Sequence, residues 1–448
     1  MAGKTPLKKI DVRKSKKKEI KTFSKEIGPK LNPQARNLCL KCRGVKKLCG
    51  KERCPVMQKY YSQLNDEKKK QFDTDHIQGD SPPSVFIGRY NYPNVNVGPL
   101  VPPEKGDTSL YSTPENWFGK KNINDIISMR GSLVRGKKRL NTSVNISNSL
   151  DKEVEETRYL VLSKKPAESE VTFKKKLNET IRIDGESQPY GPSAQMTSFR
   201  RGTVTSSRQL EKVFYDEDLK SKKGIIKLHK KGIKVSKIQD IFMVGGTGLK
   251  NNRKFVPTRW SITAVDDILG KDLRREVKIY PKINSYHVYQ ANYLDNRWII
   301  IFTPESWRYE SIEAFYPETT WNPSTDSIAI FGDFEEYDGK KEYASIGGCY
   351  YAARLAALEK LQDDRRQAGV LILREVHPGY ILPVGVWNVR ESVRNAMKNR
   401  PTKFDTKKEV MSFIDNSMDI PINQWKSVSK MLKTRRTQKS LKEFQKDN

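Results

Sequence analysis

Four of the five cysteines of this sequence lie within sixteen residues, in the segment CLKCRGVKKLCGKERC. They form two closely spaced pairs, Cys39 with Cys42 and Cys49 with Cys54. Two such pairs can place four thiolates at tetrahedral positions about 2.3 Å from a zinc ion. Because four thiolates complete the coordination shell and leave no position for water, we expect a structural Zn²⁺. Four unpaired thiols in a loop are the alternative, but in a reducing compartment the clustering favours a metal site.

A second candidate site lies in the last twelve residues, TQKSLKEFQKDN. Gln438, Leu441 and Phe444 follow at intervals of three, so they would project together from a single 3₁₀ turn. Such a turn fits a groove on another protein, although an ordinary helix end has the same spacing. The pattern Q-x-x-L-x-x-F resembles the PCNA-interacting peptide (PIP motif) that binds the DNA sliding clamp. Gln445 stands where that motif usually has a second aromatic residue, so we expect weaker binding than a full motif gives.

Three acidic clusters could bind Mg²⁺ for phosphodiester cleavage. They are Asp333, Glu335, Glu336 and Asp338, then Asp266 and Asp267, and finally Asp184 and Glu186. Charged turns produce the same pattern, and no cluster has a nuclease spacing. His287 and His377 could act as acid–base groups, although neither has an identified partner. We interpret Cys349 as a small core residue. The catalytic residues, and whether the protein is an enzyme, therefore stay open.

Two stretches combine basic and aromatic residues in a way that suits single-stranded or distorted DNA, where bases are free to stack. They contain Arg253, Lys254, Arg259 and Trp260, and Arg297, Trp298, Trp307, Arg308 and Tyr309. A buried ring beside a surface arginine gives the same pattern, so both interpretations stay open. The glycines of MVGGTGLKNNRK lack the spacing of a phosphate-binding loop and indicate a plain turn.

The charge balance points to a polyanionic partner. The 448 residues include 84 Lys and Arg against 53 Asp and Glu, a net charge of +31. Nucleic acid is the commonest partner of such a surface, and a membrane surface is the next. No apolar run approaches the ~18 residues that span a bilayer, and the N-terminus lacks the apolar stretch of a signal peptide. We therefore expect a cytoplasmic, nucleoid-associated protein that has DNA and no membrane as its partner.

The elements that must position these residues alternate between strand-like and helix-like segments. We expect a multidomain α+β fold of mixed sheets and helices, with a small N-terminal four-cysteine zinc module and disordered basic termini. The patterns predict strands at SVFIGRY, RYLVLS, SYHVYQANYL, RWIIIFTP and GVLILREV, and a strand followed by a turn at SIAIFGDFEEYDGKKEY. They predict helices at NINDIISMRGSLV and, strongly amphipathic, at YYAARLAALEKLQDDRR.

Composition divides the chain into five parts. These are a disordered basic arm at 1–35, the zinc module with a following helix at 36–72, a mixed region at 84–284, a region richer in aromatic residues at 285–400, and a basic helical tail with the terminal motif at 401–448.

Several stretches together resemble the archaeal Nre family of DNA repair proteins. They are the four-cysteine module, VFIGRYNYPNVNVGPLVP, FVPTRWSITAVDD, GGCYYAARLAALEKL, LPVGVWNVRE and the terminal Q-x-x-L-x-x-F. The likeness runs from about Cys39 to the end of the chain. It implies that 84–284 is the N-terminal domain of the family and that 285–400 is its C-terminal domain.

The resemblance also implies a role in DNA damage repair, with recruitment by PCNA and with other repair proteins as further partners. The clamp-binding residues of the family would be Gln438, Leu441 and Phe444, with Gln445 at the last position of the motif. The resemblance therefore indicates the pathway in which the protein acts, but it does not indicate which reaction, if any, the protein catalyses. Two alternatives therefore stay open: a metal-dependent nuclease or other DNA-modifying enzyme, and an RNA-binding or ribosome-associated protein.

Overall fold

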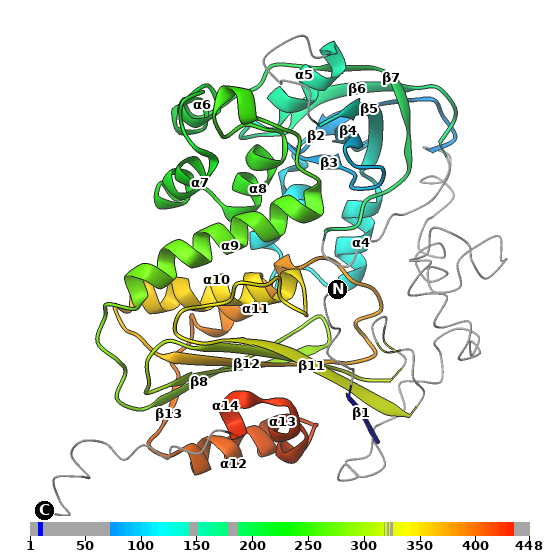
Figure 1. Ribbon diagram of the computed structural model, residues 1–448. Coiled ribbons are helices and arrows are strands. Elements are labelled where there is room, and N and C mark those ends of the chain that lie inside the picture. The colour runs from blue at the N-terminus through cyan, green and yellow to red at the C-terminus, as the bar shows by residue number, and fades with distance from the viewer. Residues whose placement is uncertain are drawn as a thin grey trace, which may run out of the picture.

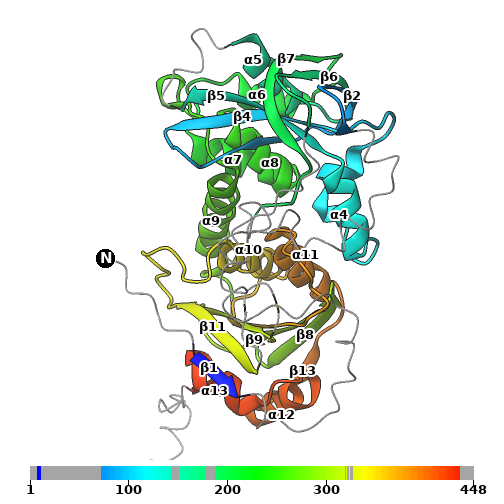
Figure 2. The same cartoon turned by 90° about the vertical axis from the view of Figure 1, so that its right-hand side faces the viewer.

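The computed structural model describes residues 8–11, 72–142, 151–177, 187–317, 319, 322 and 326–433. These residues form two mixed β-sheets and eleven α-helices, which confirms the α+β class (Figure 1). A six-stranded and a seven-stranded sheet lie in different halves of an elongated molecule, with helices between them (Figures 1 and 2). The domain boundaries expected from the sequence stay a prediction.

The six-stranded sheet has the order β2-β6-β7-β5-β4-β3, with β5 and β7 parallel and the other pairs antiparallel. Its strands are β2 (His76–Ser81), β3 (Val85–Ile87), β4 (Asn94–Val101), β5 (Val134–Asn141), β6 (Ala167–Phe173) and β7 (Ser193–Arg201). The side chains alternate, so that Val95, Val97 and Val171 enter the core while Gln195 is exposed on the opposite face. Such alternation is typical of a sheet with one covered face.

Helices pack against this sheet and fill the space between the two sheets. They are α4 (Ile123–Gly131), α5 (Lys152–Leu160), α6 (Arg208–Phe214), α7 (Ser221–Lys230), α8 (Val235–Met243) and α9 (Thr258–Val277), with 3₁₀ turns η4 (Ser109–Ser112), η5 (Pro114–Asn116) and η6 (Lys250–Asn252). The 20-residue helix α9 runs between the two halves of the molecule (Figure 1). None of the helices in the described part of the chain is long and apolar enough to cross a membrane.

The strand predicted for RYLVLS is wrong, whereas the helix predicted at NINDIISMRGSLV is confirmed as α4. Tyr159 and Leu160 form the last turn of α5, and a turn follows at Val161. The helix already begins at Lys152, and its buried residues Val154 and Leu160 lie on one side of it. The apolar run therefore ends a helix that starts in a polar segment upstream.

The seven-stranded sheet has the order β1-β11-β10-β12-β9-β8-β13, with β10 and β12 parallel. Its strands are β1 (Lys8–Asp11), β8 (Tyr286–Tyr293), β9 (Asn296–Thr303), β10 (Tyr309–Phe315), β11 (Ser327–Glu335), β12 (Gly369–Val376) and β13 (Thr402–Phe404). The predicted strands at 285–303, 327–335 and 369–376 are confirmed. The sequence predicted no element at β1, which joins β11 through the backbone groups that an edge strand offers to an extended segment.

Helices cover both faces of the seven-stranded sheet. The inner face meets α10 (Gly348–Asp363) and α11 (Trp387–Ala396), and the outer face meets α12 (Lys407–Ser417), α13 (Ile422–Val428) and α14 (Lys430–Lys433) (Figure 1). In β9, Ile300 and Phe302 enter the inner core while Ile299 and Ile301 enter the outer one. A continuous apolar run is expected for a strand that is covered on both faces.

Helix α10 is confirmed, but its predicted amphipathic character is wrong. Residues 350–358 are all buried, around the whole circumference of the helix. This burial arises because α10 packs against α9, α11 and β10 at once.

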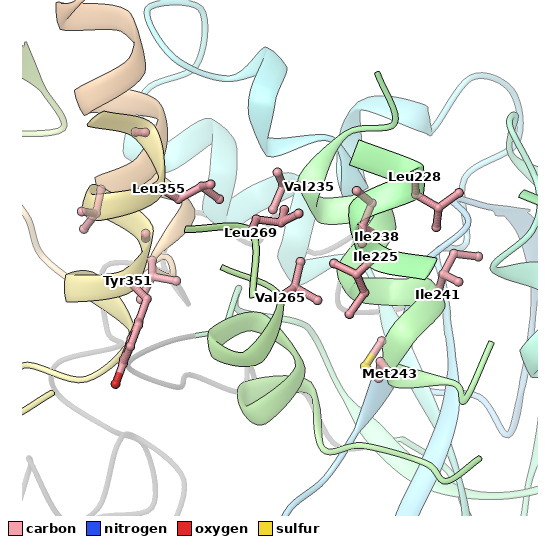
Figure 3. Close-up of a cluster of buried hydrophobic side chains, with 14 of the residues drawn as sticks. Ile225, Leu228, Val235, Ile238, Ile241, Met243, Val265, Leu269, Tyr351 and Leu355 are labelled. Carbon is pink, nitrogen blue, oxygen red and sulfur yellow. The ribbon is translucent and has the colours of Figure 1, made fainter. Parts of the chain in front are cut away.

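One continuous core joins the two sheets. Figure 3 shows part of it, formed by Ile225 and Leu228 of α7, Ile238 and Ile241 of α8, Val265 and Leu269 of α9, and Leu355 of α10. The same cluster includes Val97 of β4 and Ile300 of β9. The two halves of the molecule are therefore packed into one body.

Candidate nucleic-acid interface

The second basic and aromatic stretch belongs to the protein interior. Its three rings are at most 2% exposed: Trp298, Trp307 and Tyr309. Its two arginines form ion pairs, Arg308 with Glu305 at 2.8 Å and Arg297 with Asp419 at 2.6 Å. These rings cannot stack on bases, so the structure favours the alternative of buried rings beside paired arginines.

The first stretch is divided between the interior and the surface. Arg253 is buried, and its guanidinium donates to the backbone carbonyls of Gly248, Phe214 and Asp216. The guanidinium of Arg253 is therefore occupied by the protein backbone and is not available to a phosphate. Lys254 is exposed, and the indole of Trp260 is 42% exposed. Trp260 is therefore accessible for stacking on a base, and its role in binding DNA stays a prediction.

Trp260 lies in the first turn of α9, beside the tip of the β3–β4 hairpin. The N–H of Ile87 in β3 donates to Oγ1 of Thr258 at 2.9 Å, which holds the start of α9 against the edge of the sheet. The ring centroids of Trp260 and Tyr92 are 4.9 Å apart, with an interplanar angle of 58°. Tyr92 is 49% exposed, and Tyr90 on the same hairpin tip is 64% exposed. We call Tyr90, Tyr92 and Trp260 the aromatic platform.

Basic side chains accompany the platform. The guanidinium of Arg89 lies over the ring of Tyr90, 5.5 Å from its centroid. Arg259 directly precedes Trp260, and Lys254 lies in the segment that leads into α9. Rings interleaved with positive charges are the combination that proteins use to bind single strands.

The open face of the six-stranded sheet continues from the platform as a polar surface. Asn96 of β4 pairs with Arg139 of β5, and Lys137 of β5 pairs with Gln195 of β7. Because paired residues of neighbouring strands point to the same side, these four side chains share one face. The amide Nε2 of Gln195 lies 3.5 Å from Oδ1 of Asn96, to which it donates. We call these four residues the polar strip.

Arg135 fixes the polar strip relative to the hairpin. Its buried guanidinium donates to the backbone carbonyl oxygens of Phe86 at 3.2 Å and of Asn96 at 2.6 Å. It also lies over the Phe86 ring, 4.5 Å from the centroid. One side chain of β5 therefore holds β3 against β4, the two strands that meet at the hairpin tip of Tyr90 and Tyr92.

The charge changes along this face of the sheet. Its far strands, β2 and β6, carry Asp80, Glu168 and Glu170. The segments that form the platform and the strip contain no acidic residue, although 53 residues of the chain are acidic: 84–101, 134–141, 190–201 and 251–263. A polyanion is therefore attracted to one end of the face and repelled from the other.

A cavity of about 50 Å³ lies beneath the hairpin and the start of α9. Its walls include Phe86 of β3, Ser261 of α9 and Asp240 of α8. Burial raises the pKa of the Asp240 carboxyl above its ordinary range and lowers the pKa of neighbouring Lys237. The volume suffices for a few water molecules and is too small for a nucleobase. We therefore expect bases to stack on the platform and not to enter the cavity.

Arginines neutralise two of the acidic clusters. Arg354 is 1% exposed and contacts Glu335 at 2.8 Å and Asp267 at 2.6 Å. Arg390 contacts Asp266 at 3.0 Å. Carboxylates held by buried guanidinium groups are structural ion pairs, which leaves them poorly suited to bind Mg²⁺.

His287, Cys349 and the remaining candidate magnesium ligands each have their own surroundings. Asp333 accepts a hydrogen bond from Nζ of Lys340 at 2.8 Å, and Asp338 is 98% exposed. His287 lies on β8, where burial lowers the pKa of its imidazole. Cys349 packs against the core at the start of α10, as expected of a small core residue.

His377 has partners that the sequence did not identify. It lies 3.3 Å from Glu375, and one ligand-type atom each from His377, Glu375 and Asp419 lie within 4.8 Å of one another. Glu375 already accepts hydrogen bonds from the N–H groups of Asp419 and Ile420, and Asp419 is paired with Arg297. The group is thus satisfied by the protein itself, and we assign no metal to it.

Two predicted sites lie outside the described residues. They are the zinc cysteines Cys39, Cys42, Cys49 and Cys54 and the clamp-binding residues Gln438, Leu441, Phe444 and Gln445. The acidic pair Asp184 and Glu186 also lies outside them. The structure therefore leaves these predictions as they stand.

Sequence reasoning missed Tyr90, Tyr92 and the polar strip. The segment GRYNYPNV contains an available signal, because two tyrosines alternate with turn-forming asparagine and proline where a hairpin must reverse. The strip had no such signal, since its four residues come from three strands that only their pairing brings together.

Comparison with known proteins gives consistent matches. The family model described as archaeal Nre, N-terminal, matches residues 48–322, and the model described as archaeal Nre, C-terminal, matches residues 335–444. The chain is 38% identical over 407 residues to DNA repair protein NreB of Archaeoglobus fulgidus, which covers 91% of this chain and 99% of that relative. It is 35% identical to DNA repair protein NreA of the same organism, over 82% of this chain and 90% of the relative. DNA repair protein NreA of Haloferax volcanii is 33% identical, over 74% and 81% respectively. No solved structure matches the chain.

Proposed function

The chain belongs to the archaeal Nre family, and on that premise we propose that it acts in DNA repair. The observation that carries this proposal is the 38% identity to a protein named DNA repair protein NreB, over 99% of that relative. The names of two further relatives contain the same description. The net charge of +31 agrees with a protein that works on a polyanion.

We propose that the sliding clamp PCNA recruits the protein through its C-terminal peptide. The proposal is supported by the spacing of Gln438, Leu441 and Phe444, which lie within the last eleven residues of the sequence. A short peptide on a terminus can reach a partner while the folded body contacts DNA. Tethering then raises the local concentration at repair sites without a sequence-specific contact.

We also propose that Cys39, Cys42, Cys49 and Cys54 hold one structural zinc ion. Four thiolates are a donor set that zinc prefers, and the site would stabilise its segment without taking part in chemistry. Metal analysis of the purified chain should find one zinc per molecule, lost in Cys42→Ser/Cys54→Ser. A metal-free wild-type chain that is folded would contradict this assignment.

Binding of the purified full-length chain to the clamp tests the proposed recruitment. Wild type should bind, and Gln438→Ala/Leu441→Ala/Phe444→Ala should not, in enough salt to suppress attraction between the basic tail and the clamp. Two controls act on the same tail. Lys439→Ala/Lys442→Ala should bind as wild type does, and Gln445→Phe should bind more tightly because it restores a second buried ring.

Equal binding of the wild type and the triple variant would contradict recruitment by this peptide. Stronger binding to structured RNA than to any DNA, together with no clamp binding, would favour the RNA-binding alternative.

A further inference from the structure

We propose that the aromatic platform binds unpaired bases of DNA by stacking, while the polar strip follows the backbone of the same strand. The inference deepens the proposed function and rests on it, because it names the DNA structure that the repair protein contacts. The substrate class is single-stranded DNA, or duplex DNA with extruded or unpaired bases.

The first argument is the unusual exposure of the rings. The other tryptophans of the described residues are at most 3% exposed: Trp117, Trp298, Trp307, Trp387 and Trp425. Trp260 is 42% exposed, and it lies against Tyr92, which is 49% exposed. Single apolar residues at a surface are ordinary, whereas a group of large rings marks a binding site.

The second argument is that the rings are held in position before any ligand arrives. Asn91, at the hairpin tip, has a positive φ of 64°, and its carbonyl accepts the N–H of Asn94 at 2.8 Å. This turn fixes the backbone that carries Tyr90 and Tyr92, the bond from Ile87 to Thr258 fixes the start of α9, and the rings of Tyr92 and Trp260 support each other. Prepositioned rings lose little conformational entropy when a base stacks on them.

The third argument is the chemistry around the rings. The neighbours of the rings are the basic side chains of Arg89, Arg259 and Lys254 and the amides of the polar strip. No carboxylate occurs in the segments that form this surface. Positive charges suit phosphates, rings suit base faces, and this combination tolerates any sequence.

The described helices are poorly suited to bind the major groove of duplex DNA. Helices α7 and α8 have helix-turn-helix spacing, with Gly232 at a φ of 75° in the turn. In such motifs the second helix enters the major groove. Here α8 lies in the protein interior: Val235, Ile238 and Ile241 are buried, and the hydroxyl of Ser236 donates a hydrogen bond to Glu115 at 2.9 Å. This helix therefore cannot read a groove.

The size of the surface indicates a short binding site. From the hairpin strand β3, across β4 and β5, to β7 the sheet surface spans three strand spacings of about 4.8 Å each, roughly 14 Å. Bases stacked at about 3.4 Å per nucleotide along one strand would cover that distance with four or five nucleotides. This agrees with the shorter single-strand sites known for sheet surfaces, about 4–16 nucleotides.

Fluorescence anisotropy with a labelled 12-nucleotide oligo(dT) and with a blunt 12-base-pair duplex tests the inference on the full-length chain. Trp260→Ala and Tyr92→Ala should each weaken oligo(dT) binding by about 5- to 150-fold, as loss of one stacked base predicts. Both should leave duplex binding within about twofold of wild type. Trp260→Phe should retain most of the affinity, because a ring remains.

Tyr343→Ala is the matched control, since Tyr343 is 60% exposed and lies on the loop before α10, away from the platform. It should bind oligo(dT) as wild type does. Circular dichroism melting of each variant separates loss of binding from loss of folding.

Unchanged oligo(dT) affinity in folded Trp260→Ala and Tyr92→Ala, or an equal loss on duplex, would overturn the inference. Unchanged DNA binding combined with loss of a protein partner would assign the platform to protein docking instead, and preference for oligo(U) over oligo(dT) would assign it to RNA. Clamp binding of the same variants is measured in parallel and should be normal. If the platform variants bind oligo(dT) as wild type does and the clamp still binds, the inference about the platform is wrong but the proposed function is not contradicted.

Discussion

Glu335 is a buried carboxylate on β11 that accepts hydrogen bonds from three side chains. Arg354 donates at 2.8 Å, Arg274 at 3.2 Å and the indole N–H of Trp307 at 3.1 Å. These partners come from α10, α9 and the segment before β10, so one carboxylate connects three parts of the fold. The sequence placed Glu335 in a candidate magnesium cluster, whereas its contacts indicate a structural role.

Replacement of Glu335 by Gln should therefore destabilise the protein. The substitution leaves the buried guanidinium of Arg354 with Asp267 as its remaining carboxylate partner. We therefore expect the free energy of unfolding to fall by about 3–5 kcal/mol in urea denaturation. Asp338→Asn, from the same acidic cluster but 98% exposed, should leave the midpoint unchanged. Equal effects of the two substitutions would contradict the structural role.

Glu359 predicts how stability depends on pH. Burial alone would raise the pKa of this carboxyl from its ordinary value of 4.5, but the charge of Arg394 and the hydrogen bonds from His229 and Arg394 lower it to about 2. A carboxyl whose pKa is lowered by folding stabilises the protein at any pH above its pKa in the unfolded chain. This contribution is lost as the pH falls towards the lowered pKa of the folded state. Stability should decline between about pH 5 and pH 2, and Glu359→Gln should show a smaller decline. Chemical denaturation over this range measures both, and identical slopes would exclude Glu359 as a cause.

At the scale of single residues, the sequence predicted residue types but not their burial. Trp260 follows Arg259 and Trp298 follows Arg297, so the two pairs look alike in the sequence. Trp298 is buried because Arg374 of β12 lies over its ring at 4.8 Å, and that neighbour is brought in only by pairing of β9 with β12. Long-range pairing of this kind has no local signal.

At the scale of elements, the polar strip depends on the close approach of β4 and β5. A side chain at Gly98 would overlap the backbone carbonyl of Gly136 on the neighbouring strand. Asn96 and Lys137 lie next to these glycines, so the spacing of the two strands sets the positions of the strip residues.

Gly98→Ala should therefore both destabilise the protein and weaken binding to single-stranded DNA. A backbone carbonyl cannot rotate away as a side chain can, and we expect a loss of about 1–3 kcal/mol in thermal or urea unfolding. Gly202→Ala is the matched control, because its added methyl would make only ordinary contacts with Glu168. Wild-type stability of Gly98→Ala would show that β4 and β5 can separate at little cost.

The elements predicted best were those with a strong and continuous apolar pattern. Strands β9 and β12 were predicted because a covered strand is apolar throughout; α10 was predicted as a helix, although the amphipathic spacing inferred for it is wrong. The error at α5 arose because its last turn is apolar and short enough to resemble a strand. Helices α6 to α9 lay in a region that the sequence described only as mixed.

At the scale of the whole molecule, the net charge of +31 does not by itself locate a nucleic-acid surface. The sheet face that contains the polar strip is basic at one end and carries Asp80, Glu168 and Glu170 at the other. Binding should therefore depend on a few particular cations as well as on the total charge. The sequence could predict a polyanionic partner, but only the sheet order separates the two ends of this face.

Salt dependence of oligo(dT) binding measures how many of these cations contact phosphates. Each phosphate contact contributes about −0.7 to the slope of log K against log salt concentration for single strands. Arg139→Ala should make the slope less negative by about that amount. Lys223→Ala removes one exposed positive charge on α7 instead, and it should leave the slope unchanged.

We propose that this chain binds DNA in repair and is held at DNA by the sliding clamp. The most direct test of this proposal is the dwell time of labelled full-length chain on a gapped DNA circle, with and without loaded clamp, for wild type and for Gln438→Ala/Leu441→Ala/Phe444→Ala. We predict that the clamp prolongs the dwell time of wild type by about 100-fold or more, as tethering allows, and that the triple variant loses this gain but keeps its clamp-independent binding. Equal dwell times of the wild type with and without the clamp would contradict recruitment of this chain by the clamp.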